Sequence, residues 1–153
     1  MVSEKLKLLK NTENGKLSEH IFVNRELDEL ISDKSDCKLA KQILELLQNS
    51  KAEEIVLIDV RYKSNLADYL FICEGRSHLH CRGIAENVVF QLKHQKVIHL
   101  GTEGELEGNW VLLDYGNILI HVFHPEIRKY YNLEELYAPS QIKHSKNNSN
   151  LLK

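Results

Sequence analysis

Apolar positions along the chain change their spacing several times, and each change marks a predicted element. Over residues 37–48 they recur at helical spacing, with Ser35 as the candidate N-cap. Residues 55–60 and 69–73 are runs of strand length rich in apolar side chains, so we expect two buried strands. Helical spacing returns over residues 77–93. These patterns predict a folded unit that mixes helices and strands.

The residues that follow predict a β-hairpin. A short strand is expected at 97–100, followed by a loop at 101–108. The apolar runs Trp110–Asp114 and Ile118–Phe123 are separated by a tight turn at 115–117, where Gly and Asn accept positive φ at little cost. A short helix comes last. This order of elements predicts an α/β domain in which helices flank a mixed β-sheet.

The two ends of the chain differ in composition from its centre. We expect residues 1–34 to form an N-terminal extension that is partly helical or flexible, residues 35–138 the folded domain, and residues 139–153 a disordered basic tail. The central segment carries fifteen acidic and eleven basic residues, whereas the tail carries three Lys and no acid. The whole chain has a net charge of −2, which argues against nucleic-acid binding as its main function.

Membrane and redox signals are weak. No apolar run approaches the roughly 20 residues that span a bilayer, and the N-terminal residues lack the apolar core of a signal peptide. We therefore expect a cytoplasmic protein without membrane contact. Cys37, Cys73 and Cys81 are odd in number and lack CxxC spacing, so neither a disulfide framework nor a zinc finger is predicted.

Two segments contain residue types found in phosphate or metal sites. Gly75 and Ser77 stand between a strand and a helix, where helix amides favour an anion, but the spacing matches no nucleotide-binding loop and Ser77 is interpreted as an N-cap. His78 and His80 are two positions apart, which places them on different helix faces. Surface or capping histidines are the predicted outcome.

Asp59, Asp68 and Asp114 are the strand-adjacent carboxylates that a metal-dependent nucleotidyltransferase would bring together. Arg61 stands where a strand-borne pair would place its second acid, and its charge opposes a divalent cation at that position. We predict structural roles for these acids, and therefore no catalytic residue, no metal and no cofactor.

The hairpin has two chemically different faces. Alternation about the turn places aliphatic residues on one face, which is interpreted as core. The other face mixes aromatic, aliphatic and titratable groups, a composition typical of protein-binding patches. A helix that covers this mixed face is the alternative, and periodicity does not decide between the two. The aliphatic face comprises Val111, Leu113, Ile118, Ile120 and Val122, and the mixed face comprises Trp110, Leu112, Asp114, Leu119, His121 and Phe123.

Several ordered motifs run through residues 36–137. They comprise Asp59-Val60-Arg61 with Ser64, Ala67-Asp68-Tyr69, Gly75-x-Ser77 with His80, Ile84-Ala85, Glu103-Gly104, Trp110-Val111-Leu112-Leu113-Asp114-Tyr115-Gly116, His121-Val122-Phe123, Arg128, Tyr131, Leu133, Glu134 and Leu136. Their order resembles that of the ribosomal silencing factor family, also called the RsfS or Iojap family. Glu74, Asn117 and Tyr137 are mild departures from the pattern of that family.

The resemblance implies a fold similar to nucleotidyltransferases without their catalytic acids. It also implies binding to the large ribosomal subunit through ribosomal protein L-fourteen, which blocks joining of the small subunit and lowers translation under nutrient limitation. A homodimer of the free protein is a further implication. We expect the ribosome contact to be centred on Trp110, with Leu112, Asp114, His121 and Phe123 around it. A nucleotidyltransferase-like enzyme with an unrecognised metal site is the alternative from another class.

Overall fold

The computed structural model describes residues 21–23, 38–61 and 67–137. In these segments a six-stranded sheet has the order β1-β2-β3-β6-β5-β4. β3 and β6 are parallel neighbours and the other neighbouring pairs are antiparallel, which confirms the predicted mixed sheet of an α/β domain. The elements are β1 (Ile21–Val23), α3 (Lys38–Asn49), β2 (Glu53–Asp59), β3 (Tyr69–Glu74), α4 (His78–His94), β4 (Gly101–Glu103), β5 (Trp110–Asp114), β6 (Ile118–Phe123), α5 (Pro125–Tyr131) and α6 (Leu133–Tyr137).

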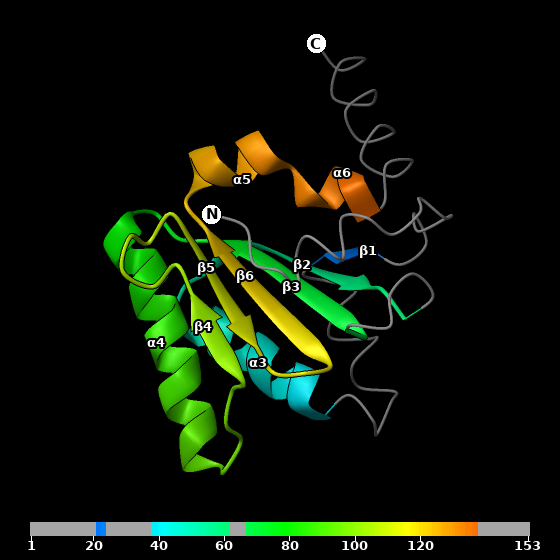
Figure 1. Cartoon of the computed structure of the whole chain (residues 1–153), viewed down its shortest axis with the longest axis vertical. Helices are drawn as coiled ribbons and strands as arrows, with labels where there is room; N and C mark the ends of the chain where they lie inside the picture. The colour runs from blue at the N-terminus through cyan, green and yellow to red at the C-terminus, as the bar shows by residue number, and fades with distance from the viewer. Residues whose placement is uncertain (1–20, 24–37, 62–66, 138–153) are drawn as a thin grey trace.

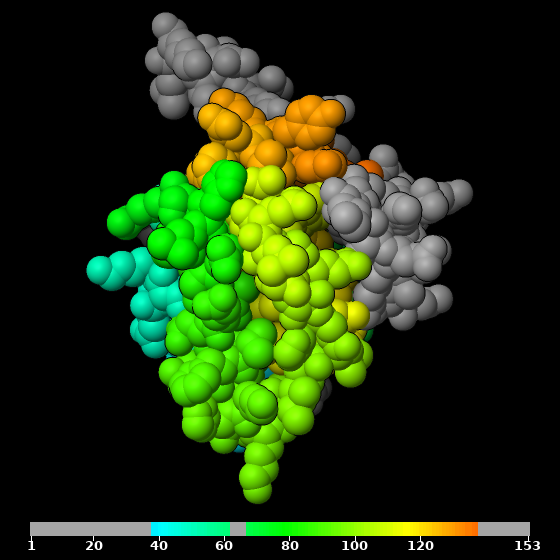
Figure 2. All heavy atoms as spheres, turned by 60° about the vertical axis from the view of Figure 1, so that its left-hand side comes forward, coloured from blue at the N-terminus to red at the C-terminus, as the bar shows by residue number. Residues whose placement is uncertain are grey.

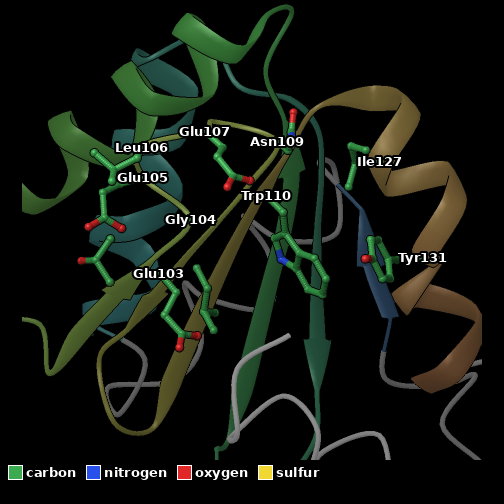
Figure 3. A pocket seen from close by; sticks show the side chains of 11 residues that line it. Glu103, Gly104, Glu105, Leu106, Glu107, Asn109, Trp110, Ile127 and Tyr131 are labelled. Atoms are coloured by element: carbon green, nitrogen blue, oxygen red, sulfur yellow. The ribbon is translucent and has the colours of Figure 1, made fainter. Parts of the chain in front are cut away.

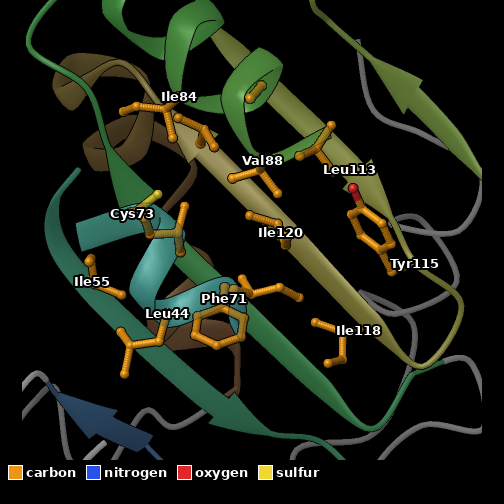
Figure 4. Packing of buried hydrophobic residues seen from close by; sticks show 14 of the residues in the cluster. Leu44, Ile55, Phe71, Cys73, Ile84, Val88, Leu113, Tyr115, Ile118 and Ile120 are labelled. Carbon is orange, nitrogen blue, oxygen red and sulfur yellow. The ribbon is translucent and has the colours of Figure 1, made fainter. Parts of the chain in front are cut away.

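Helices cover both faces of the sheet (Figure 1). The side chains of Ile55 and Leu57 on β2 join the core cluster under α3 and α4, which Figure 4 shows from close by. Val56 and Ile58, one position out of phase, join a second cluster under α5 and α6. Because both faces of the central strands are buried, their sequences are continuous apolar runs without polar alternation.

The two long helices lie close to their predicted positions. The Ser77 hydroxyl accepts a 3.0 Å hydrogen bond from the His80 amide, so the N-cap prediction for α4 is confirmed. The stripe of α3 buries Ala40, Ile43 and Leu44 completely, as helical spacing predicts. The candidate N-cap of α3, Ser35, lies outside the described residues.

One sequence prediction is wrong. The strand expected at 97–100 lies instead at β4, and Ile98 and Leu100 are 68% and 74% exposed. Pairing with β5 begins at Gly101 opposite Asp114, so these apolar side chains precede the sheet and do not enter the core. Residues 21–23 of the predicted N-terminal extension form β1 and pair with β2 at the edge of the sheet, and the rest of residues 1–34 lies outside the described residues.

None of the helices in the described segments is long and apolar enough to cross a membrane.

Candidate protein-binding face of the hairpin

The hairpin of β5 and β6 has the predicted register. Trp110 pairs with Phe123, and Leu112 pairs with His121. The turn is closed by a 2.9 Å hydrogen bond from the Tyr115 amide to the Ile118 carbonyl. This register places the predicted aliphatic face, with its five residues buried, against α3 and α4.

The mixed face lies beneath α5 and α6, so of the two alternatives the covering helix holds for most of this face. Leu112 is 6% exposed, and His121 and Phe123 are fully buried, so these three side chains do not reach the surface. α5 begins immediately after β6 and turns back over the sheet, where α6 buries Leu133 in the same cluster. Periodicity could not reveal this, because the covering helices lie beyond the hairpin in the sequence.

Trp110 is only partly buried. One part of its side chain packs against the buried residues of the mixed face, and another part is exposed to solvent. Its indole stacks on Phe123 with ring centroids 4.7 Å apart, and Tyr131 of α5 lies at the same distance. The indole Nε1–H donates a 3.1 Å hydrogen bond to Nδ1 of His121. A neutral imidazole that accepts at Nδ1 carries its proton on Nε2, so this bond sets the tautomer of the buried ring.

A groove of about 420 Å³ opens beside the indole. Figure 3 shows Trp110 between the β4–β5 connection on one side and Ile127 and Tyr131 of α5 on the other. We call it the Trp110 groove. Sequence reasoning missed it, although the alternation of Glu at 103, 105 and 107 was a signal of an acidic loop. The described residues that line the groove are Thr102, Glu103, Gly104, Glu105, Leu106, Glu107, Asn109, Trp110, Leu112, Ile127 and Tyr131.

Asp114, the remaining predicted contact residue, has a structural partner in the turn. Its Oδ1 accepts a 2.8 Å hydrogen bond from the amide of Gly116, whose φ is +86°. An Asp two residues before such an amide forms an Asx-type turn, and Gly adopts the left-handed conformation without strain. Asp114 remains half-buried at the turn end of the hairpin.

Arg61 forms an ion pair with the carboxylate of Asp59. The guanidinium approaches both carboxylate oxygens, with the closest contact at 2.6 Å, and its centre lies 5.3 Å from the centroid of the Tyr69 ring. Asp59 is 4% exposed. The Asp68 amide donates to the Asn117 carbonyl at 2.7 Å, which ties the start of β3 to the hairpin turn. Among the described residues, no group of three or more His, Cys, Asp or Glu is placed to hold a metal.

The strand-to-helix junction after β3 is built by close packing. A Cβ at Gly75 would lie 2.8 Å from the Cys81 amide nitrogen, so a side chain does not fit there. His80 accepts from the Arg76 amide at 2.9 Å through Nδ1, and its Nε2 lies 2.9 Å from the Ser50 carbonyl oxygen. The junction therefore links the end of α3 to the start of α4, with His80 hydrogen-bonded to both sides of it.

Arg128 fastens α5 to the sheet. Its Nε donates to Glu134 at 2.6 Å, and one terminal nitrogen lies 3.2 Å from Glu74 and 2.8 Å from the Glu54 carbonyl oxygen. That carbonyl belongs to an irregularity in β2, where Glu54 has a φ of 49°. We call Arg128, Glu74 and Glu134 the Arg128 clamp. Ser64, the remaining motif residue, lies outside the described residues.

Comparison with known proteins shows which family this chain is similar to. A family model described as ribosomal silencing factor during starvation, RsfS, matches residues 33–151. A ribosomal silencing factor from Zymomonas mobilis is 37% identical over 100 residues, which cover 65% of this chain and 75% of that protein. A mouse protein named mitochondrial assembly of ribosomal large subunit protein 1 is 28% identical over 124 residues, covering 79% of this chain and 49% of its own.

A crystal structure of a protein from Chromobacterium violaceum matches the fold with a TM-score of 0.64 at 31% identity. The match covers 65% of this chain and 83% of that chain. Fold and sequence together place the chain among α/β proteins with a mixed sheet covered by helices on both faces. The chain belongs to the ribosomal silencing factor (RsfS) family, which confirms the resemblance drawn from its motifs.

Proposed function

We propose that this protein binds the large ribosomal subunit through ribosomal protein L-fourteen and blocks joining of the small subunit, which lowers translation when nutrients are scarce. The mechanism is steric exclusion in the cytoplasm, with no bond made or broken. Silencing during starvation is in the description of the family, and the name of the mouse relative refers to assembly of a large subunit. A homodimer of the free protein belongs to the same proposal, and sedimentation equilibrium tests it.

The observation that carries the proposal is the position of Trp110. Trp is strongly enriched at the energetic centres of protein interfaces, where a partly exposed indole fills a pocket of the partner. The indole of Trp110 forms part of the groove surface while Phe123 and Tyr131 hold its ring. Leu112, His121 and Phe123 therefore act from beneath by orienting the indole, and Trp110 makes the direct contact.

The ion pair of Asp59 supports a binding protein over an enzyme. A guanidinium that engages both oxygens of a carboxylate competes with a metal ion for the same lone pairs. The nucleotidyltransferase alternative requires Asp59 to bind a metal. Nucleotide transfer by the purified protein that disappears in Asp59→Asn, with the fold unchanged, would establish that alternative.

The test is co-sedimentation with purified large ribosomal subunits, followed by an assay of subunit joining. Trp110→Ala should weaken binding by about 2 kcal/mol, or roughly thirtyfold. Lys93→Ala, an exposed change at the end of α4, is the control and should bind normally. Circular dichroism of each variant confirms that folded protein is compared. A folded Trp110→Ala variant that still blocks joining at the wild-type concentration would refute the proposal.

A further inference from the structure

The Trp110 groove has an acidic wall beside an apolar floor. Glu103, Glu105 and Glu107 contribute carboxylates, while the described lining residues include no Lys, Arg or His. Within residues 38–61 and 67–137, none of these three carboxylates takes part in an ion pair. All three side chains are exposed, so their charges are available to a molecule that enters the groove.

The loop that carries these carboxylates is held in one conformation by two glycines. Gly104 and Gly108 have φ values of +79° and +73°, and the Gly108 amide donates a 3.1 Å hydrogen bond to the Gly104 carbonyl. A Cβ at Gly104 would lie 1.9 Å from the Trp110 carbonyl oxygen, and one at Gly108 would lie 2.4 Å from that of His78. The loop therefore packs against both β5 and α4, and in Figure 2 the yellow-green atoms of the segment that contains the loop lie against the green atoms of α4.

The opposite wall suits the stem of a long cationic side chain. Ile127 and Tyr131 of α5 line the groove beside the indole of Trp110 (Figure 3), and the Tyr131 ring packs against the indole with centroids 4.7 Å apart. The methylene groups of Lys or Arg pack on such apolar surfaces while the charged end reaches outward. The faces of Trp and Tyr rings also attract cations electrostatically.

The geometry points to a protein segment with exposed Lys or Arg side chains as the occupant of the Trp110 groove. This inference rests on the proposed function, because it describes the part of the large subunit that the groove receives. The cationic side chain lies along Trp110 and Tyr131, and its charge pairs with Glu105 and Glu107. Ribosomal RNA is disfavoured at this position, because its phosphates would approach carboxylates of the same charge.

The experiment removes the charge while keeping the shape of the loop. Glu105→Gln combined with Glu107→Gln is compared with Glu45→Gln combined with Glu86→Gln, a matched pair that removes the same charge from exposed positions on α3 and α4. Binding to purified large subunits is measured at several salt concentrations. The loop variant should bind roughly fivefold more weakly at low salt, the typical effect of losing two exposed ion pairs, and its affinity should depend less on salt.

Three other outcomes overturn the inference. Binding by the loop variant as tight as that of the wild-type protein and of the control variant would show that the groove receives no cation. Tighter binding by the loop variant alone would show that the loop faces RNA phosphates. Equal weakening of both variants would show that only the overall charge matters. Failure of the wild-type protein to bind large subunits refutes the proposed function itself, so the two failures are distinguishable.

Discussion

The Arg128 clamp makes a quantitative prediction about how α5 is held. In Arg128→Met the side chain keeps a similar apolar stem and loses the guanidinium, which leaves Glu74, Glu134 and the Glu54 carbonyl without their donor. Breaking a buried ion pair costs about 3–5 kcal/mol. The three side chains of the clamp are 11–18% exposed, so we expect a smaller loss in the free energy of unfolding, of about 2–3 kcal/mol.

The chain offers a matched control in the ion pair between Arg76 and Glu53. Its side chains are 66% and 45% exposed, and an exposed pair contributes about 0.2–1 kcal/mol. Arg76→Met should therefore lower the free energy of unfolding by less than about 1 kcal/mol. Urea unfolding followed by circular dichroism measures both variants on the same scale.

Trp110 is the only Trp in the chain, and it reports on the same clamp. Tyr131 of α5 packs against its indole, so release of α5 exposes the ring to water. Arg128→Met should shift the emission of Trp110 to longer wavelength in the absence of urea, whereas Arg76→Met should leave it unchanged. Equal destabilisation by the two variants, or an unshifted spectrum in Arg128→Met, would refute the reasoning.

Three further predictions concern the acidic loop, the core and the tail. Gly108→Ala should destabilise the protein by about 2–4 kcal/mol in urea unfolding, because positive φ and a contact with the His78 carbonyl both oppose a Cβ. Gly83→Ala in α4, where a Cβ meets nothing within 4 Å, should instead stabilise by about 1 kcal/mol, and equal effects would contradict this account. Burial raises the pKa of Cys73 and of Tyr115 to about 12 from 9.0 and 10.0, so the unfolded chain loses these protons first. Stability should therefore be fully present below pH 9 and fall as pH rises toward 12, by up to about 1.4 kcal/mol per pH unit for each group, and melting temperatures that stay constant over this range would contradict it. Deleting residues 140–153 should leave folding and the specific ribosome contact intact, because the sequence of the tail lacks apolar anchors; a melting temperature lower by many degrees would show that the tail packs.

Local patterns in the sequence determined the hairpin and most of the sheet. Alternation and the Gly-Asn turn set the register that pairs Trp110 with Phe123, and these signals lie within fourteen consecutive residues. The start of α4 was also predictable from neighbouring residues, because the Ser77 hydroxyl caps the amide of His80, three positions away. The resemblance to the family came from the sequence as well, and the comparisons confirm the family.

The accessibility of the hairpin faces was decided by tertiary structure. His121 and Phe123 have the composition of an interface and are nevertheless buried, because α5 and α6 fold back over them. Arg128 holds that arrangement through Glu74, a partner 54 positions away. The Trp110 groove likewise depends on contacts between distant residues: Gly108 packs against the His78 carbonyl, and the Tyr131 ring packs against Trp110. Periodicity measures only which residues share a face, whereas exposure depends on what packs against that face from elsewhere in the chain.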